Sequence, residues 1–336
     1  MLALLFLSTS LISCKSNTKP VERETYMMGT IIHLKVYGSN AKNATEKALQ
    51  RISDIENKMS VNIETSEITK LNAKAGISAE QLSTDTYSVI EKSVQYSKLT
   101  KGALDATIEP IVKLWGIGTD KERIPSKSEI DEKLKLVDYN DIILDSKSST
   151  VKLRRTGQAI DLGAIAKGYT ADEVKKVLIS NKISSALINL GGNVYAIGNK
   201  TDGTSWNIGV QNPLDTRGQY IGTISVTDKS IVTSGNYERY FIKDGKRYHH
   251  IFDSKTGYPS EAGIISTTII SDNSIDGDAL STSTYILGLT KGLKLVESIK
   301  GVDAIFITTD KKVYITDGIK DKFNLTSKEF TYEEGR

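Results

Sequence analysis

The chain has 336 residues, with 44 Lys and Arg against 41 Asp and Glu and a formal net charge of +3. This balance argues against a nucleic-acid binder, and the 38% hydrophobic and 25% charged fractions are those of a folded globular protein. One cysteine, Cys14, and three histidines, His33, His249 and His250, exclude an internal disulfide, a cysteine-based metal or iron–sulfur site and a histidine-rich metal centre.

The first residues predict a bacterial lipoprotein signal. Residues Leu2 to Ile12 are largely apolar, and they are too few to span a bilayer, which needs roughly 20 residues. They end in Leu11-Ile12-Ser13-Cys14, which resembles the lipobox whose cysteine becomes acylated. The run departs from the usual signal in one respect, because no Lys or Arg precedes it. We therefore expect a signal at residues 1–14, a polar tether at 15–24 and a folded domain at 25–330. The protein would be lipid-anchored to a bacterial cell membrane, facing the periplasm or the cell exterior.

The first half of that domain predicts one strand followed mainly by helices. The strand is Thr30–Tyr37, an alternating run rich in β-branched residues. The other elements expected there are a helix from the cap Asn43 to Met59, a helix over about Thr86–Leu99, a short helix from a Ser126/Glu129 capping box to near Val137, a strand pair over Ile142–Leu153 and a helix over Ala164–Ser180.

Strands dominate the second half. They are expected at Ala186–Leu190, Trp206–Val210, Tyr220–Val226, Tyr248–Phe252 and Ile264–Ser271, with helices at Ser274–Leu287 and Thr290–Ile299 and a closing hairpin of Ala304–Thr308 and Val313–Thr316. Runs of strands beside grouped helices predict an α+β fold. We expect a single intertwined catalytic unit with a mixed or antiparallel sheet.

A glycine-rich segment, Ile160 to Tyr169, reads as a strand end that runs into a helix start. Backbone N–H groups at such a start can hold an anion, and Lys167 could add a positive charge for phosphate. Taken alone, a glycine turn with a solvated lysine explains the segment as well, since it matches neither common nucleotide-binding glycine motif.

The adjacent histidines His249 and His250 fall on an expected strand, which directs them to opposite faces. At most one can point into a cleft, so a general base is a better functional role than a metal pair. An ordinary surface histidine pair is the alternative.

Farther on, Asp278, Ser281 and Thr282 share one face of an expected helix. A carboxylate with hydroxyl groups suits a hard cation such as Mg²⁺, completed by carbonyl, water or phosphate oxygens. A capping cluster at the helix N-terminus explains the same spacing equally well.

Taken together and in this order, the motifs of the chain resemble the ApbE family of FAD:protein FMN transferases. The resemblance runs from Tyr26 to about Tyr314. It rests on Met28-Gly29-Thr30, Gly102-Ala103-Leu104-Asp105, Asp161 through Tyr169, Asn189-Leu190-Gly191-Gly192-Asn193, His250-Ile251-Phe252-Asp253 with Thr256-Gly257, and Asp278-Ala279-Leu280-Ser281-Thr282. Three positions depart from the family pattern: Ala164 replaces a common Gly, Ser254 the usual Pro, and Ser281 the Asp of some relatives.

The resemblance implies a role for each matching residue. His250 matches the histidine proposed as catalytic. Positions that contact FAD in the family are matched by Met28, Asn62, Ala103, Leu104, Asp105, Asp161, Lys167 and Ile251. Positions that bind Mg²⁺ are matched by Ala164, through its carbonyl, and by Asp278, Ser281 and Thr282.

The implied reaction is Mg²⁺-dependent transfer of FMN from FAD to a threonine or serine hydroxyl of an acceptor flavoprotein, with release of AMP. The resemblance implies acceptors among the subunits of Nqr- or Rnf-type electron-transport complexes. Two alternatives remain open at this point: an Mg²⁺-dependent FAD pyrophosphatase that gives FMN and AMP, and a non-catalytic FAD-binding lipoprotein.

Overall fold

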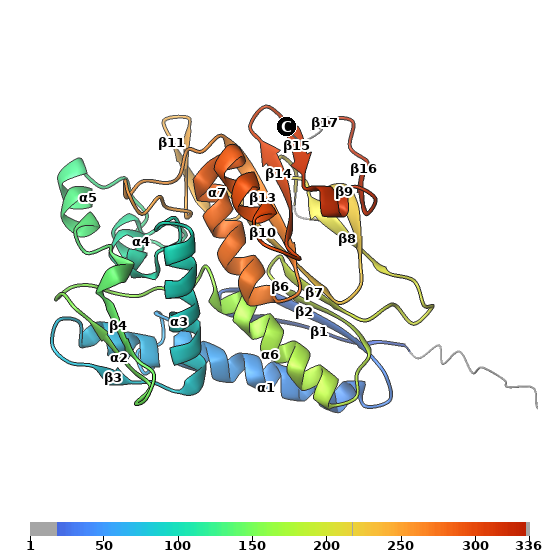
Figure 1. Ribbon diagram of the computed structural model, residues 1–336, viewed down its shortest axis with the longest axis horizontal. Coiled ribbons are helices and arrows are strands. Elements are labelled where there is room, and N and C mark those ends of the chain that lie inside the picture. The colour runs from blue at the N-terminus through green and yellow to red at the C-terminus, as the bar shows by residue number, and fades with distance from the viewer. Residues whose placement is uncertain (1–18, 217, 334–336) are drawn as a thin grey trace, which may run out of the picture.

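The computed structural model describes residues 19–216 and 218–333. A large central sheet carries helices on one face and a smaller sheet on the other, with a helical lobe at one end (Figure 1). The predicted signal and lipobox, with Cys14, lie outside the described residues. Among the residues that are described, no helix has the length and apolar character to cross a membrane.

The central sheet has nine strands, in the order β1-β2-β6-β7-β10-β13-β14-β15-β17. All neighbours pair antiparallel except β15 and β17, which are parallel. The expected α+β class with a mixed sheet is therefore confirmed. The strands are β1 (Val21–Met27), β2 (Thr30–Tyr37), β6 (Ser185–Leu190), β7 (Asn193–Ile197), β10 (Lys229–Gly235), β13 (Ile264–Ser271), β14 (Asp303–Thr308), β15 (Lys312–Ile315) and β17 (Thr331–Glu333).

Three helices, α1 (Ala41–Met59), α6 (Ala166–Ser180) and α7 (Ser274–Glu297), cover one face of this sheet (Figure 1). Alternation along the strands explains how both faces are covered. Ile269 of β13 packs in the cluster that includes Ala279 and Leu280 of α7, whereas the next residue, Ile270, packs in the cluster on the opposite face. Strand β13 is consequently buried along its whole length, and α7 packs directly against it.

The opposite face is covered by a three-stranded sheet of β8 (Trp206–Gln211), β9 (Tyr220–Val226) and β16 (Phe323–Leu325). A separate hairpin, β11 (Tyr240–Lys243) with β12 (Lys246–His249), follows β10. The end lobe contains α2 (Glu67–Ala73), α3 (Thr84–Leu99), α4 (Glu109–Trp115), α5 (Lys127–Leu134), β3 (Glu80–Gln81), β4 (Ile142–Asp145) and β5 (Thr150–Leu153), with short 3₁₀ turns at Ala106–Ile108 and Tyr139–Asp141. A further 3₁₀ turn, Asp317–Ile319, packs in the cluster between the two sheets.

Several predicted boundaries are corrected by the structure. The tether was expected to reach residue 24, but β1 begins at Val21 and pairs along its length with β2. The first helix begins at Ala41 rather than at a cap on Asn43, because Asn40 is the flanking residue. The capping box of Ser126 and Glu129 is confirmed, with both reciprocal hydrogen bonds present.

Around the predicted site, two expectations were wrong in ways that matter. Residues 160–165 form a loop, not a strand end, and helix α6 starts at Ala166. The strand expected over Tyr248–Phe252 ends at His249, so His250 lies just beyond it. The expectation of two helices after Ser274 is confirmed: they meet at a break at Gly288, whose φ of 78° is not helical, and together they make up α7, which ends at Glu297.

Candidate active site

The site is organised by the close approach of α6 and α7. The N–H of Gly168 is one of the unpaired donors at the start of α6, and it donates to Asp278 Oδ2 at 2.9 Å. A Cβ on residue 168 would lie 2.3 Å from the carbonyl oxygen of Ser274 and 2.7 Å from Asp278 Cβ. Only glycine fits there, so Gly168 sets the distance between the two helices and places the Asp278 carboxylate at the start of α6.

Lys167 lies directly beside this carboxylate. Its Nζ donates to the Gly163 carbonyl at 2.8 Å and lies 3.5 Å from Asp278 Oδ1. The neighbouring Ala164 carbonyl precedes the helix and accepts no hydrogen bond among the described residues. A buried carboxylate and a free carbonyl oxygen therefore both belong to this helix start.

The hydroxyl groups of the predicted metal set converge with Ser234 of β10. Ser281 is fully buried, donates to the Asp278 carbonyl at 3.0 Å, and lies 2.8 Å from Ser234 Oγ. Thr282 Oγ1 is 3.2 Å from the same Ser234 oxygen and is half-buried. Ser234 was not predicted from the sequence, because nothing in the pattern of β10 distinguishes it.

The oxygen atoms of this group match the ligands of the implied Mg²⁺ ion. They come from one carboxylate, one carbonyl and two hydroxyls. In the described part of the chain, no cluster of three or more His, Cys, Asp or Glu side chains could hold a metal ion by itself. The set therefore fits a hard cation that takes several further ligands from water or phosphate, as Mg²⁺ does, and does not fit a softer metal.

The two histidines have different surroundings. His249 is 5% exposed; its Nδ1 accepts from the Ile251 N–H, so its Nε2 carries the proton and donates to the Ser260 carbonyl at 3.0 Å. Both of its nitrogens are occupied, and burial lowers its pKa to about 4. His249 is thus a structural residue that holds the loop after β12.

Among the described residues, His250 has a hydrogen-bond partner at only one of its nitrogens. Its Nδ1 lies 3.1 Å from the Arg239 carbonyl oxygen, so Nδ1 must carry the proton and donate, which leaves the Nε2 lone pair available. Burial lowers the pKa of His250 to about 3, and the nearby positive charges of Arg239 and Lys167 act in the same direction. The imidazole is therefore neutral at physiological pH and able to accept a proton.

Arg239 is a second residue that sequence reasoning missed. Besides orienting His250 through its carbonyl, it donates from Nη2 to the Gly29 carbonyl at 2.8 Å. Met28 at that turn has a φ of 53° and donates its N–H to Glu56 of α1. The turn between β1 and β2 is thus held against both α1 and the His250 loop. The sequence gives little indication of Arg239, because this residue lies in a loop without a recognisable motif.

The loop that carries Ala103, Leu104 and Asp105 is fixed from within. Ala103 and Leu104 are buried, and Asp105 accepts from Thr107 and from the N–H of Tyr139 at 3.0 Å. Burial raises the pKa of Asp105, and these donors oppose that shift. The carboxylate of Asp105 holds the loop in shape.

The His250 loop is anchored to the same region. Ser254 Oγ donates to the Gly102 carbonyl, and the indole N–H of Trp115 donates to the Gly257 carbonyl at 2.9 Å. Gly257 has a φ of 70°, and a Cβ there would meet Ile130 at 2.7 Å. The Thr256-Gly257 motif therefore ties the loop to α4 and α5.

Asp161 faces an unexpected neighbour, Glu109 in the first turn of α4. Asp161 accepts from the Gly163 N–H at 2.5 Å, and burial raises its pKa, opposed by Gly163, Lys167 and Arg239. Burial, together with the negative charge of Asp161, raises the pKa of Glu109 to about 8. The buried Oε2 of Glu109 has no hydrogen-bond partner among the described residues. Glu109 is therefore a protonated carboxyl beside the predicted site.

Of the remaining predicted residues, most lie together at one core cluster, and Asn62 lies apart from them. Ile251 and Leu104 belong to one core cluster, against which Met28 and Ala164 pack. Asn62 lies exposed in the connection between α1 and α2, and its N–H donates to Ser60 Oγ. No interaction found in the structure joins Asn62 to the other predicted residues within the described ranges.

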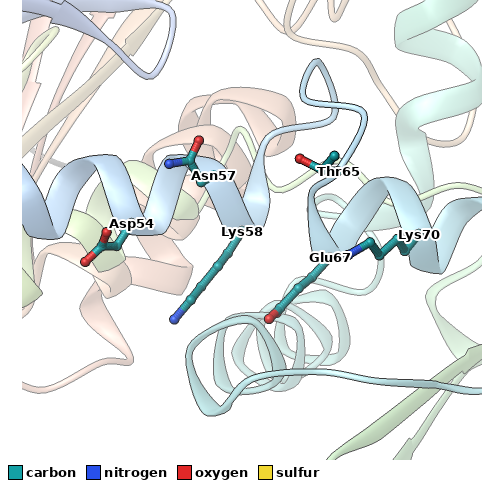
Figure 2. A pocket seen from close by; sticks show the side chains of 6 residues that line it. All are labelled: Asp54, Asn57, Lys58, Thr65, Glu67 and Lys70. Carbon is teal, nitrogen blue, oxygen red and sulfur yellow. The ribbon is translucent and has the colours of Figure 1, made fainter.

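A surface hollow of about 470 Å³ lies between α1 and α2 (Figure 2). Lys58 and Glu67 extend from it toward α3, where Lys58 pairs with Asp85 and Glu67 accepts from Ser83 (Figure 2). None of the predicted site residues lines it, so we assign it no role. Its lining residues are Asp54, Asn57, Lys58, Thr65, Glu67 and Lys70.

Comparison with known proteins relates the whole chain to one family. A protein of Treponema pallidum (strain Nichols) named FAD:protein FMN transferase is 33% identical over 336 residues, which is 95% of this chain and 93% of that protein. A protein of the same name from Klebsiella pneumoniae (strain 342) is 35% identical over 309 residues, covering 92% and 96%.

Solved structures agree. The ApbE protein of Thermotoga maritima superposes with a TM-score of 0.83 at 32% identity, over 89% of this chain and 98% of that one. The flavin transferase ApbE of Vibrio cholerae superposes with a TM-score of 0.78 at 26% identity, over 93% and 98%. The sequence model of the ApbE family matches residues 28–306. The chain therefore belongs to the ApbE family.

Proposed function

We propose that this chain is an FAD:protein FMN transferase, which moves FMN from FAD to a threonine or serine hydroxyl of an acceptor protein and releases AMP. The observation that carries the proposal is the state of His250: a neutral imidazole, fixed through Nδ1 on a backbone carbonyl, with Nε2 available. Membership in a family whose relatives carry this name supports it.

His250 acts as the general base. Its Nε2 accepts the proton of the acceptor hydroxyl as the hydroxyl oxygen forms a bond to the FMN-side phosphorus. The bond from that phosphorus to the bridging oxygen of the pyrophosphate breaks, and AMP leaves with the electron pair of that bond. The Arg239 carbonyl holds the ring in the tautomer that this step needs.

Positive charge near the reacting phosphates comes first from Lys167 and Arg239, whose charges both lower the pKa of His250. An Mg²⁺ ion held by Asp278, Thr282 and the Ala164 carbonyl would neutralise pyrophosphate charge. Ser281, the second hydroxyl of the set, donates to the Asp278 carbonyl and lies 2.8 Å from Ser234 Oγ, and these contacts hold the oxygens of the set together.

The place of action is also part of the proposal. The apolar start and the Cys14 lipobox support anchoring to a bacterial cell membrane through a lipid on Cys14, with the catalytic domain on its outer side. Acceptors there would be flavoprotein subunits of Nqr- or Rnf-type complexes. Labelling with a palmitate analogue tests the anchor: the label is expected on the wild-type protein and absent from Cys14→Ser.

The transfer itself is tested with the full chain, FAD, Mg²⁺ and an acceptor subunit, followed by mass spectrometry of the acceptor. We expect an acceptor heavier by one FMN less one water, with one AMP per label. His250→Asn and Asp278→Asn should each abolish labelling. Asp276→Asn is the matched control, because Asp276 lies on the same helix but pairs with Lys92 and Tyr96. Release of free FMN without acceptor labelling would contradict the proposal and indicate a pyrophosphatase instead.

A further inference from the structure

The two oxygens of the Asp278 carboxylate have different neighbours. Oδ2 accepts the Gly168 N–H at 2.9 Å, a bond that belongs to the helix contact and cannot be given up without uncapping α6. Oδ1 lies toward the Lys167 ammonium at 3.5 Å. Oδ1 is therefore the oxygen with which a divalent cation would bind, and it already has a positively charged neighbour.

The Lys167 ammonium can move away from the Asp278 carboxylate. Its ammonium makes one hydrogen bond, to the Gly163 carbonyl at 2.8 Å, and 28% of its side chain is exposed, against 4% for Asp278. A lysine on a flexible four-carbon stem changes direction at small cost, whereas the buried Asp278 cannot follow it. The same ammonium is close enough to Asp161 and His250 to affect the pKa of both.

We propose that Lys167 competes with the divalent cation for Asp278: its ammonium pairs with Oδ1 until the cation binds there, and it then turns to a phosphate oxygen of FAD. This inference rests on the proposed function, since it concerns the same metal and the same substrate. It follows that metal and FAD bind cooperatively. When the cation binds Oδ1, the released Lys167 ammonium needs an anion, and a phosphate of FAD supplies it. When the phosphate takes the ammonium, Oδ1 is left without a positive neighbour, and the cation supplies one.

The competition makes a prediction that is opposite in sign for the two ligands. Lys167→Met removes the competing charge, so the FAD-free protein should bind metal about three- to tenfold more tightly. In the metal-loaded protein the same change removes the phosphate contact of the released ammonium, so FAD should bind several-fold more weakly at saturating metal. General damage to the site would weaken both, and therefore cannot imitate this result.

The test uses the full chain without FAD, titrated with Mn²⁺ and followed by the electron paramagnetic resonance of free Mn²⁺, with Mg²⁺ as competitor. FAD affinity is measured by flavin fluorescence at saturating Mg²⁺, without an acceptor. Lys176→Met is the matched control: it removes a charge from the same helix, but from a lysine paired with Glu173, and should leave both affinities unchanged. Lys167→Gln, which can still donate to Gly163, should also tighten metal binding and serves if the methionine variant melts early.

Unchanged or weaker Mn²⁺ binding by both Lys167 variants would overturn the inference. If the wild-type chain transfers FMN and binds Mn²⁺ while the variants show no tightening, only the competition is refuted. If the wild-type chain transfers no FMN and binds no Mn²⁺, the proposed function fails and the inference fails with it.

Discussion

Asp172 and Asp278 each cap the helix that carries the other. Asp172, on α6, accepts the N–H groups of Ser274 and Ile275 at 2.8 and 2.9 Å, at the start of α7. Asp278, on α7, accepts the N–H of Gly168 at the start of α6. A carboxylate at a helix N-terminus satisfies unpaired donors and the helix dipole together. The two helices are thus locked by reciprocal caps, and the predicted metal ligand is itself one of them.

Removing the first of these caps should disturb the second. We expect Asp172→Asn to lower the free energy of unfolding by about 1–2 kcal/mol, because an amide oxygen replaces a charged acceptor for two donors. Mn²⁺ affinity should fall as well, since the start of α7 positions Asp278. Urea denaturation and Mn²⁺ titration measure the two effects. Mn²⁺ affinity equal to that of the wild type would show that the caps act independently.

The glycine between the helices gives a second prediction. Gly168→Ala places a methyl group where Ser274 and Asp278 leave no room, so α6 and α7 must separate. We expect a loss of about 1–3 kcal/mol in the free energy of unfolding, together with loss of FMN transfer. Denaturant melts and the acceptor-labelling assay measure these. An alanine variant with wild-type stability and labelling would mean that the helix contact is not as close as described.

The state of His250 predicts how stability depends on pH. Its folded pKa is about 3, below the ordinary 6.5, because burial disfavours the charged ring. Between these values the unfolded chain binds more protons, so the contribution to stability is complete above pH 6.5 and is lost as the pH falls toward 3. His250→Asn should therefore lose less stability than the wild type between pH 7 and about 4.5, as measured by urea denaturation.

The same state of His250 predicts the activity profile. Because the base is already neutral, kcat/KM for FAD should show no acid limb near pH 6.5, and activity should decline only at lower pH. An acid limb at the ordinary histidine pKa would contradict the burial of this ring. Because unfolding of the protein in acid also lowers the measured activity, the activity at each pH is divided by the fraction of protein that is folded.

Arg239 affects the site through its side chain and its backbone, and the two can be separated. Arg239→Lys keeps a positive charge and the carbonyl that orients His250, but loses the bond to the Gly29 carbonyl. The lost bond holds the turn of Met28, a predicted FAD contact, against the His250 loop. We therefore expect the KM for FAD to rise about fivefold with little change in kcat. A large fall in kcat with unchanged KM would instead place the guanidinium at the reacting phosphorus.

Glu109 predicts a pH effect of the opposite sign to that of His250. Its folded pKa of about 8 lies above the ordinary value, so stability from this group is complete at low pH and is lost as the pH rises through 8. Glu109→Gln, which cannot ionise, should be more stable than the wild type at pH 8.5 by about 1–2 kcal/mol and little different at pH 5. The exposed Glu132→Gln is the control. Equal stability of Glu109→Gln and wild type at pH 8.5 would show that Glu109 is already ionised and solvated.

Much of the framework follows from local patterns. The alternation of Thr30–Tyr37 specified a strand, and Ser126 with Glu129 specified a helix start, because strand pleat and helix capping depend on neighbours within a few residues. Where the pattern was ambiguous, the boundaries moved. Residues 160–165 differ from the local expectation because their shape depends on Asn72 and Ala106, which hydrogen-bond to Ile160 and Asp161 from distant parts of the chain.

By itself the sequence determined the fold class, the family motifs and the residue types of the site, including the shared face of Asp278 and Thr282. Only the tertiary structure decided which of these residues meet. It paired Asp278 with Gly168 and Lys167, separated a structural His249 from an available His250, and brought in Arg239, Ser234, Asp172 and Glu109. The physical reason is that each of these contacts joins segments far apart in the chain, whose distance is set by packing between helices and sheet rather than by local spacing.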